Sequence, residues 1–203
     1  MKKFNFITAF FLLLFFVIGC TSSPSVPVNT TLATCDSTLT QFQNAWASLN
    51  YPITTSPENL VQEYTFNVNT NKTICSIGYQ GSIANFSNNT PYTIEIYNNT
   101  TSIMVYSGSI TFNSTSVDYK TITPTSLVAN QSYTIRRIAS NINAQMSGPG
   151  IQSVGTWKNF TANVVVFPIV SGVLTITGSK IYNGNQANLC TNCGIPFLDI
   201  VFQ

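Results

Sequence analysis

The 203-residue sequence contains no histidine, and only 7% of its residues are charged. Histidine is the usual general base near neutral pH, the base that activates Ser and Cys nucleophiles, and the commonest metal ligand. We therefore expect neither an enzyme nor a site for a metal or another cofactor. Positive charge is also scarce after the first three residues, apart from the pair Arg136-Arg137. Nucleic acids are bound through many phosphate contacts, so we expect no nucleic-acid partner.

The one long apolar stretch runs from Phe4 to Val17, directly after Lys2 and Lys3. It is too short for a comfortable transmembrane helix and has the proportions of a secretory signal. It ends in Val17-Ile18-Gly19-Cys20, which resembles the lipobox of bacterial lipoproteins. The resemblance implies cleavage after Gly19, acylation of Cys20 by chains such as palmitate, and a membrane anchor of two or three lipid chains.

This organisation predicts three segments. We expect residues 1–19 to be a signal peptide and residues 20–34, which are rich in Ser, Thr and Pro, to be a lipidated flexible tether. Residues 35–203 are long enough for a single folded domain. The expected location is the bacterial cell envelope, by default the outer membrane, at its periplasmic or its surface face.

Four cysteines follow Cys20, and an even number in an exported chain predicts two disulfides with three alternative connectivities. We favour Cys35–Cys75 and Cys190–Cys193, because the second pair is local and would close a tight loop. Cys190-Thr-Asn-Cys193 also has the spacing of a redox pair, which requires a helix start in a βαβ setting that the sequence does not supply. A zinc site would need all four thiolates.

From residue 62 onward, apolar residues alternate with polar ones, as in Tyr64-Phe66-Val68, Tyr92-Ile94-Ile96 and Tyr133-Ile135. Turn-rich segments separate these runs. This pattern predicts an all-β fold, an antiparallel β-sandwich of the jelly-roll or Ig-like kind. The continuous apolar run Val164–Phe167 predicts a central strand that is covered on both faces. Before the strands, Leu39, Phe42, Trp46 and Leu49 have helical spacing, which predicts one short N-terminal helix.

The order of the strands and turns over residues 73–138 has a recognisable layout, in which Ile74, Ile77 and Gly78 are followed by the strand pair Tyr92–Tyr97 and Ile103–Tyr106. Gly108–Phe112 and Leu127–Thr134 complete it. The layout resembles an uncharacterised bacterial sandwich domain that accompanies secreted carbohydrate-active or adhesive proteins. The resemblance implies a β-sandwich and transfers no catalytic residue.

Alternation places Glu95 and Tyr97 outward on one strand, and Met104 and Tyr106 outward on the next. An exposed aromatic ring beside a carboxylate is typical of sugar-binding faces, because sugar CH groups stack on rings while hydroxyls bond to carboxylates. Cross-strand tyrosines alternatively stabilise the sheet and bind nothing.

Two further positions are candidate contact residues. The alternation breaks at Arg136-Arg137, so we expect one of them to turn inward at a bulge. Arg136 then either recognises a carboxylate or sulfate on a glycan or pairs with Glu95 or Asp118. Trp157, expected in the loop after Gly155, either contacts a ligand or closes the end of the core.

Two classes of function stay open. The first is a non-catalytic module that binds a glycan or a protein at the envelope. The second is a structural or interaction subunit of an envelope complex with no small ligand. Glu63 and Glu95 are the pair on which a two-carboxylate glycosidase would depend, but nothing in the sequence places them in a cleft.

Overall fold

The computed structural model describes Cys35 and residues 41–49, 53–56, 60–140, 153–157, 165–182 and 190–203, with the backbone alone for 53–56 and 153–157. All of these residues belong to one compact unit, residues 33–203. The predicted lipobox, the predicted tether and the predicted helix positions before Gln41 lie outside the described residues. Within them, no helix is long and apolar enough to cross a bilayer.

Most of the described chain forms antiparallel strands, and two packed sheets make a β-sandwich, as the alternation predicts. The large sheet contains six strands in the spatial order β11-β10-β2-β7-β4-β5, and a seventh, β9, pairs with β10. Their bounds are β2 Val61–Val68, β4 Tyr92–Asn98, β5 Ile103–Ile110, β7 Ser132–Ala139, β9 Ile169–Ser171, β10 Leu174–Tyr182 and β11 Cys190–Thr191.

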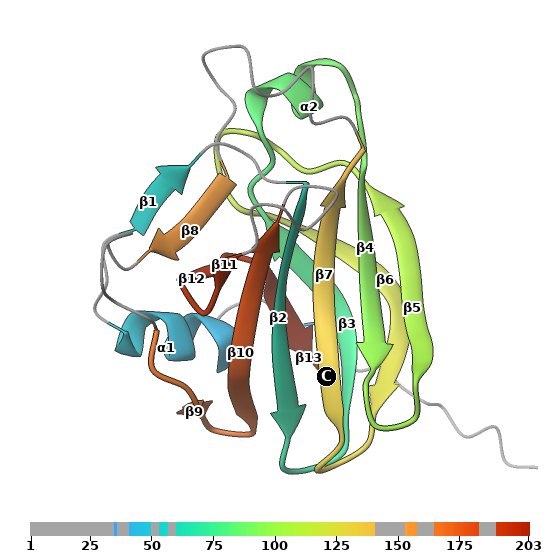
Figure 1. Ribbon diagram of the computed structural model, residues 1–203. Helices are drawn as coiled ribbons and strands as arrows, with labels where there is room; N and C mark the ends of the chain where they lie inside the picture. Colours follow the sequence, from blue (N-terminus) through green and yellow to red (C-terminus); the bar gives the residue numbers. More distant parts are fainter. Residues whose placement is uncertain are drawn as a thin grey trace, which may run out of the picture. The chain divides into compact units, whose positions relative to one another are not determined.

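The small sheet lies behind the large one in Figure 1 and has the order β13-β3-β6. Its strands are β3 Lys72–Tyr79, β6 Asp118–Leu127 and β13 Asp199–Phe202. A third sheet has the order β1-β8-β12, with β1 Ile53–Ser56, β8 Ser153–Trp157 and β12 Gly194–Pro196. Two helices complete the unit, α1 Gln41–Ser48 and α2 Ile83–Ser87.

Strict alternation in the central strands builds the core between the two large layers. On β2, Tyr64, Phe66 and Val68 are completely buried, and on β4 the same holds for Ile94 and Ile96. Successive side chains of a strand point to opposite faces, so the residues between them form the outer face of the large sheet. The predicted sandwich therefore follows from a periodicity that the sequence shows directly.

The helix α1 covers the core at the side where β10 and β13 lie (Figure 1). Its Phe42, Ala45 and Trp46 are buried, in agreement with the predicted helical spacing. The Phe42 ring stacks on Tyr64 at 5.3 Å, and Trp46 meets Phe197 edge-on at 4.9 Å. Such aromatic pairs stabilise a core beyond the area they bury.

A buried carboxylate fastens α1 to the small sheet. Asp199 is fully buried on β13, and its Oδ2 accepts hydrogen bonds from Gln43 Nε2 at 2.9 Å and from the Tyr119 hydroxyl at 2.7 Å. Burial raises the pKa of Tyr119, and the Asp199 carboxylate raises it further, so the phenol stays protonated and donates. Gly78 of β3 lies opposite Tyr119 of β6, and a side chain at position 78 would collide with the Tyr119 ring.

The predicted central strand at Val164–Phe167 is wrong. Residues 165–168 form no strand, and Val166 is 73% exposed. Proline at position 168 has no N–H for a sheet ladder, which disfavours a central strand here. The strand that follows is the three-residue β9, which is confined to pairing with β10.

Both predicted disulfides are confirmed. Cys35 bonds to Cys75 on β3, across 40 positions of sequence, and Cys190 bonds to Cys193 across three. Disulfides of this kind are typical of an oxidising compartment outside the cytoplasm. The first one ties Cys35, the first residue that the structure describes, to the central strand of the small sheet.

The two disulfides are expected to stabilise the fold unequally, because a cross-link that closes a longer loop removes more entropy from the unfolded chain. Replacing Cys35 and Cys75 by Ser should lower the free energy of unfolding by about 4 kcal/mol, and replacing Cys190 and Cys193 by about 2 kcal/mol. Urea unfolding of the two double variants of fragment 21–203 measures both values. An equal or reversed order would contradict this account.

Candidate binding face

The outer face of the large sheet consists of the side chains that alternate away from the core on β10, β2, β7, β4 and β5. Strand register arranges them in rows that cross the sheet. The charged row, a name we use below, contains Lys180, Glu63, Arg136, Glu95 and Ser107. Four charged side chains of alternating sign therefore lie side by side on four neighbouring strands.

Arg136 lies at the centre of the charged row, between two carboxylates. Its Nε donates to Glu63 Oε2 at 3.0 Å, and its Nη1 lies 3.6 Å from Glu95 Oε2. The Glu63 side chain is only 9% exposed, the Glu95 side chain 20% and the Arg136 side chain 35%. The guanidinium is thus oriented from both sides, while part of it remains open to solvent.

The next row toward the β4–β5 hairpin is uncharged and rich in hydroxyls. It contains Thr65, Thr134, Tyr97 and Met104 in register across β2, β7, β4 and β5. The hydroxyls of Thr65 and Thr134 lie 3.3 Å apart, and Asn99 Nδ2 donates to the Thr134 hydroxyl at 3.0 Å. Tyr97 stands two residues from Glu95 on the same strand, so their Cα atoms are about 7 Å apart and their side chains lie on the same face.

Tyr182 stands near the charged row at the far end of β10. Burial raises its pKa, and Glu63 and Glu95 raise it further while Arg136 opposes them. Tyr182 is therefore a neutral phenol at physiological pH, able to donate and to accept a hydrogen bond. Together with Lys180, it is a member of this face that sequence analysis did not identify, because β10 has a register shift between Ile176 and Gly178 that reverses the alternation.

The prediction that Tyr106 shares the outer face with Tyr97 is wrong. Tyr106 pairs with Ile96, which is buried, and it packs against the core from the edge strand β5. A side chain at Gly108 would collide with the Tyr106 hydroxyl, so the ring lies along the inner side of β5. The reason is a register shift between Ile96 and Tyr97, which leaves Val105 as an extra residue and changes the face of every residue before it.

The two neighbouring arginines point to opposite faces, as predicted, but not because of a bulge. Pairing of β7 with β2 and with β4 is continuous through both residues. Arg137 is fully buried, and its guanidinium carbon lies 5.3 Å from the ring centres of both Tyr79 and Tyr92. Its position is that of a core residue, so Arg136 alone belongs to the candidate face.

Trp157 is not in a loop. It is the last residue of β8, opposite Gly194 of β12, in the third sheet. Its side chain lies outside the described part of the structure, so its predicted contact role stays a prediction. Its strand does not belong to the sheet that carries Arg136.

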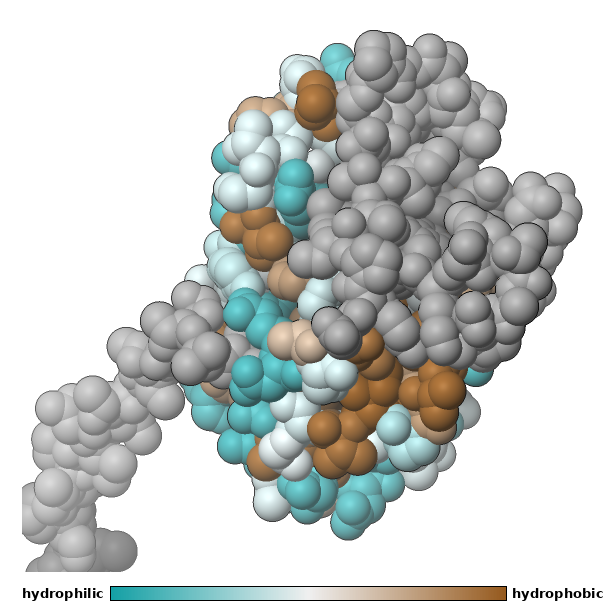
Figure 2. Space-filling model, turned by 90° about the vertical axis from the view of Figure 1, so that its left-hand side faces the viewer, coloured by the Kyte–Doolittle hydropathy of each residue, from teal (hydrophilic) through white to brown (hydrophobic). Residues whose placement is uncertain are grey.

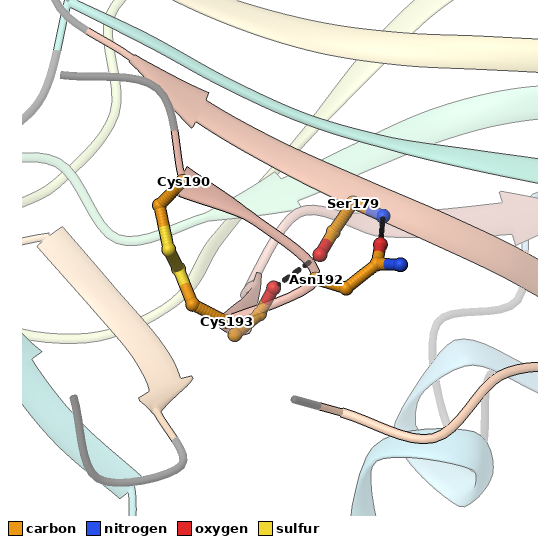
Figure 3. Close-up of a disulfide and its surroundings, with 5 residues drawn as sticks. Ser179, Cys190, Asn192 and Cys193 are labelled. Atoms are coloured by element: carbon orange, nitrogen blue, oxygen red, sulfur yellow. Dashed lines mark hydrogen bonds between the residues drawn. A yellow bond between two sulfur atoms is a disulfide. The ribbon is translucent and has the colours of Figure 1, made fainter. Parts of the chain in front are cut away.

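The Cys190–Cys193 disulfide closes a turn that is docked on β10 (Figure 3). Asn192 adopts a left-handed φ of 58°, and its Oδ1 accepts a hydrogen bond from Ser179 N at 2.9 Å. Asn192 N donates back to Ser179 O at 2.9 Å, and the Ser179 hydroxyl donates to Gly194 O. This arrangement fits a structural disulfide. With all four cysteines bonded, none of them offers the thiolate that zinc requires.

Exposed apolar side chains lie elsewhere as well. The large ones in the described residues are Ile83, Phe86, Ile103, Met104, Val128, Val166 and Val170. Figure 2 shows the side of the molecule that carries α1 and β9, where apolar residues gather in the lower part of the face. Met104 differs from the others because it lies on β5 opposite Tyr97, at the end of the row that contains Tyr97.

The positive and negative side chains of the charged row are equal in number, and this limits the ligands that the row can bind. Arg136 is paired on both sides, so a carboxylate or sulfate would compete with Glu63 and Glu95 for it. A neutral hydroxyl can instead accept from Arg136 and donate to Glu95 in the same place. Glu63 and Glu95, the pair considered for glycoside hydrolysis, lie on either side of the Arg136 guanidinium, which contacts both carboxylates.

No protein-family model matches the sequence, and a comparison with characterised proteins finds no similar one. Any group of three or more potential metal ligands is also absent from the described ranges.

Replacing Arg136 by Met should destabilise the fold by roughly 1–2 kcal/mol at pH 7, because it leaves two poorly exposed carboxylates without their cation. Thermal or urea unfolding at pH 7 measures it.

Lys120→Met is the matched control, because Lys120 forms an exposed ion pair with Asp118 at 2.8 Å. Exposed pairs contribute roughly 0–1 kcal/mol, so this variant should change stability little. An Arg136→Met loss that is no larger than that of the control would refute a stabilising role for the ion pairs of Arg136.

Proposed function

We propose that this chain is a bacterial cell-envelope lipoprotein, anchored through Cys20, whose sandwich is a non-catalytic module that binds a neutral glycan. The lipobox Val17-Ile18-Gly19-Cys20 and the two disulfides support the location outside the cytoplasm. The tether of residues 20–34 spans at most about 50 Å when extended, which lets the folded unit reach away from a bilayer surface.

One observation carries the binding proposal. Arg136, Glu95 and Tyr97 lie on one face, with the guanidinium oriented by two carboxylates. Sugars are bound by such sets, because a ring stacks on the CH groups while charged groups bond to adjacent hydroxyls. A flat sheet centre also supports these side chains on rigid strands, so little conformational entropy is lost on binding.

A second candidate is an interaction subunit of an envelope complex without a small ligand. Met104 favours it, since it is 43% exposed and continues the surface beyond Tyr97. Protein interfaces are enriched in methionine and aromatic residues. The inward turn of Tyr106 also favours it, because Tyr97 then has no second tyrosine beside it on β5.

A glycan-array screen of the soluble fragment 21–203 tests the first candidate. We expect binding to an uncharged glycan class, and Tyr97→Ala should weaken it roughly threefold to tenfold, the effect of one ring contact. Arg136→Met should weaken it as well. Tyr106→Ala is the matched control, because it removes the same side chain from the opposite face and should leave affinity unchanged.

Far-UV circular dichroism of each variant verifies that the fragment is folded. Binding that Tyr106→Ala reduces as much as Tyr97→Ala would place the site elsewhere. A blank array with folded, disulfide-bonded protein would refute glycan binding and leave the interaction subunit as the better proposal.

A further inference from the structure

The large sheet ends on one side at β5, which lies at the right-hand edge in Figure 1. In the part of the chain that the structure describes, β4 pairs with one side of β5 and no strand pairs with the other. A free edge presents a row of backbone N–H and C=O groups that can pair with a further strand. Proteins that stay monomeric normally protect such an edge.

The other long edge of the described sandwich, β6, is protected. It carries Lys120 and Pro124, and its pairing with β3 is irregular between Ile74 and Ser76. Lysine, proline and bulges are the usual means of preventing edge-to-edge pairing. The eight residues of β5 include no charged residue and no proline. The edge at β6 therefore carries features that prevent pairing with another strand, whereas the edge at β5 has neither the charge nor the proline that would do so.

Part of β5 is also regular enough to act as a template. The single register shift in its pairing leaves Val105 as the extra residue, and Tyr106–Ile110 then pair without interruption with Tyr92–Ile96. Within this segment, Tyr106, Gly108 and Ile110 lie on the inner side and Ser107 and Ser109 on the outer side. Both serines are exposed.

We propose that β5 pairs antiparallel with β5 of a second copy of this chain, centred on Gly108. This register places Tyr106 of one copy opposite Ile110 of the other, and Ser107 opposite Ser109. Aromatic residues opposite β-branched ones and hydroxyls opposite hydroxyls are favourable cross-strand pairs. Gly108 faces Gly108 at the centre, so no side chains collide there.

The charge distribution favours a second copy as the occupant. Since β5 itself is uncharged, pairing with itself opposes no like charges. The nearest charged side chain in the charged row is Glu95, on the adjacent strand β4. The Glu95 residues of two copies would lie three strand spacings apart, about 14 Å, which is beyond the screening length of about 8 Å at physiological salt.

Pairing of this kind joins two large sheets into one continuous sheet, and the two-fold axis that relates the copies is perpendicular to that sheet. The outer faces of the two copies, each with its charged row, would then lie on the same side. Two linked sites bind a polymer more tightly than one by avidity. This consequence rests on the proposed function, whereas the pairing itself does not.

Cysteine crosslinking of the full chain tests the pairing. Two differently tagged forms are expressed together, one with Ser107→Cys and one with Ser109→Cys, and are oxidised with copper–phenanthroline. Opposite residues of an antiparallel pair have Cα atoms about 4.5–5.5 Å apart, which suits a disulfide. We expect a covalent dimer that carries both tags and that reducing agent separates.

The controls decide the outcome. Wild-type chain measures any crosslink through Cys20, and Thr123→Cys in both tagged forms measures random collision at an exposed site on the protected edge β6. A mixed-tag dimer several times more abundant than in both controls supports the proposal. A mixed-tag yield equal to that of either control overturns the proposal. Stronger crosslinking of Ser107→Cys with itself, or of Ser109→Cys with itself, overturns the register. Crosslinks to other proteins overturn the second copy as the partner and indicate that β5 pairs with a different protein.

Discussion

The continuous register of β7 between β2 and β4 is the constraint on which the rest of the structure depends. It sends Tyr133 and Ile135 into the core, and it sends adjacent arginines to opposite sides of the same sheet. Arg137 becomes a core residue against Tyr79 and Tyr92, while Arg136 stands between Glu63 and Glu95. A shift of β7 by one residue would exchange the environments of Arg136 and Arg137 and would turn the outer face of the strand into the core. For this reason such a register is strongly specified.

Low charge content gives this one row its importance. Most of the surface that the strands present is made of Ser, Thr, Asn and Gln, so the charged row stands out as a place where several ionised groups are held together. The pairing partners orient Arg136 but also balance its charge. For that reason the geometry favours a neutral, hydroxyl-bearing ligand over the anionic glycan that an isolated arginine would suggest.

Sequence periodicity was sufficient for the sandwich, because Tyr64-Phe66-Val68 and Tyr92-Ile94-Ile96 alternate without interruption. Both disulfides followed from local spacing and cysteine count. Periodicity failed where a single extra residue changes the face to which side chains point. With Val105 as the extra residue on β5, Tyr106 points inward, and the register shift on β10 places Lys180 and Tyr182 on the outer face. Nothing in the composition of β5 or β10 marks those positions. The apolar run at Val165–Phe167 was misleading because hydrophobicity alone does not distinguish a central strand from an exposed segment before proline.

The role proposed for this face depends on an anchor at the envelope, and acylation of Cys20 is its most direct test. Cells that express the full chain are grown with an alkyne-bearing palmitate, and the purified chain is examined for the label. The account predicts labelling of the wild-type chain and none of Cys20→Ser, in which the lipid acceptor is lost. Equal labelling of both chains, or no labelling of the wild type, would contradict the assignment as a lipoprotein.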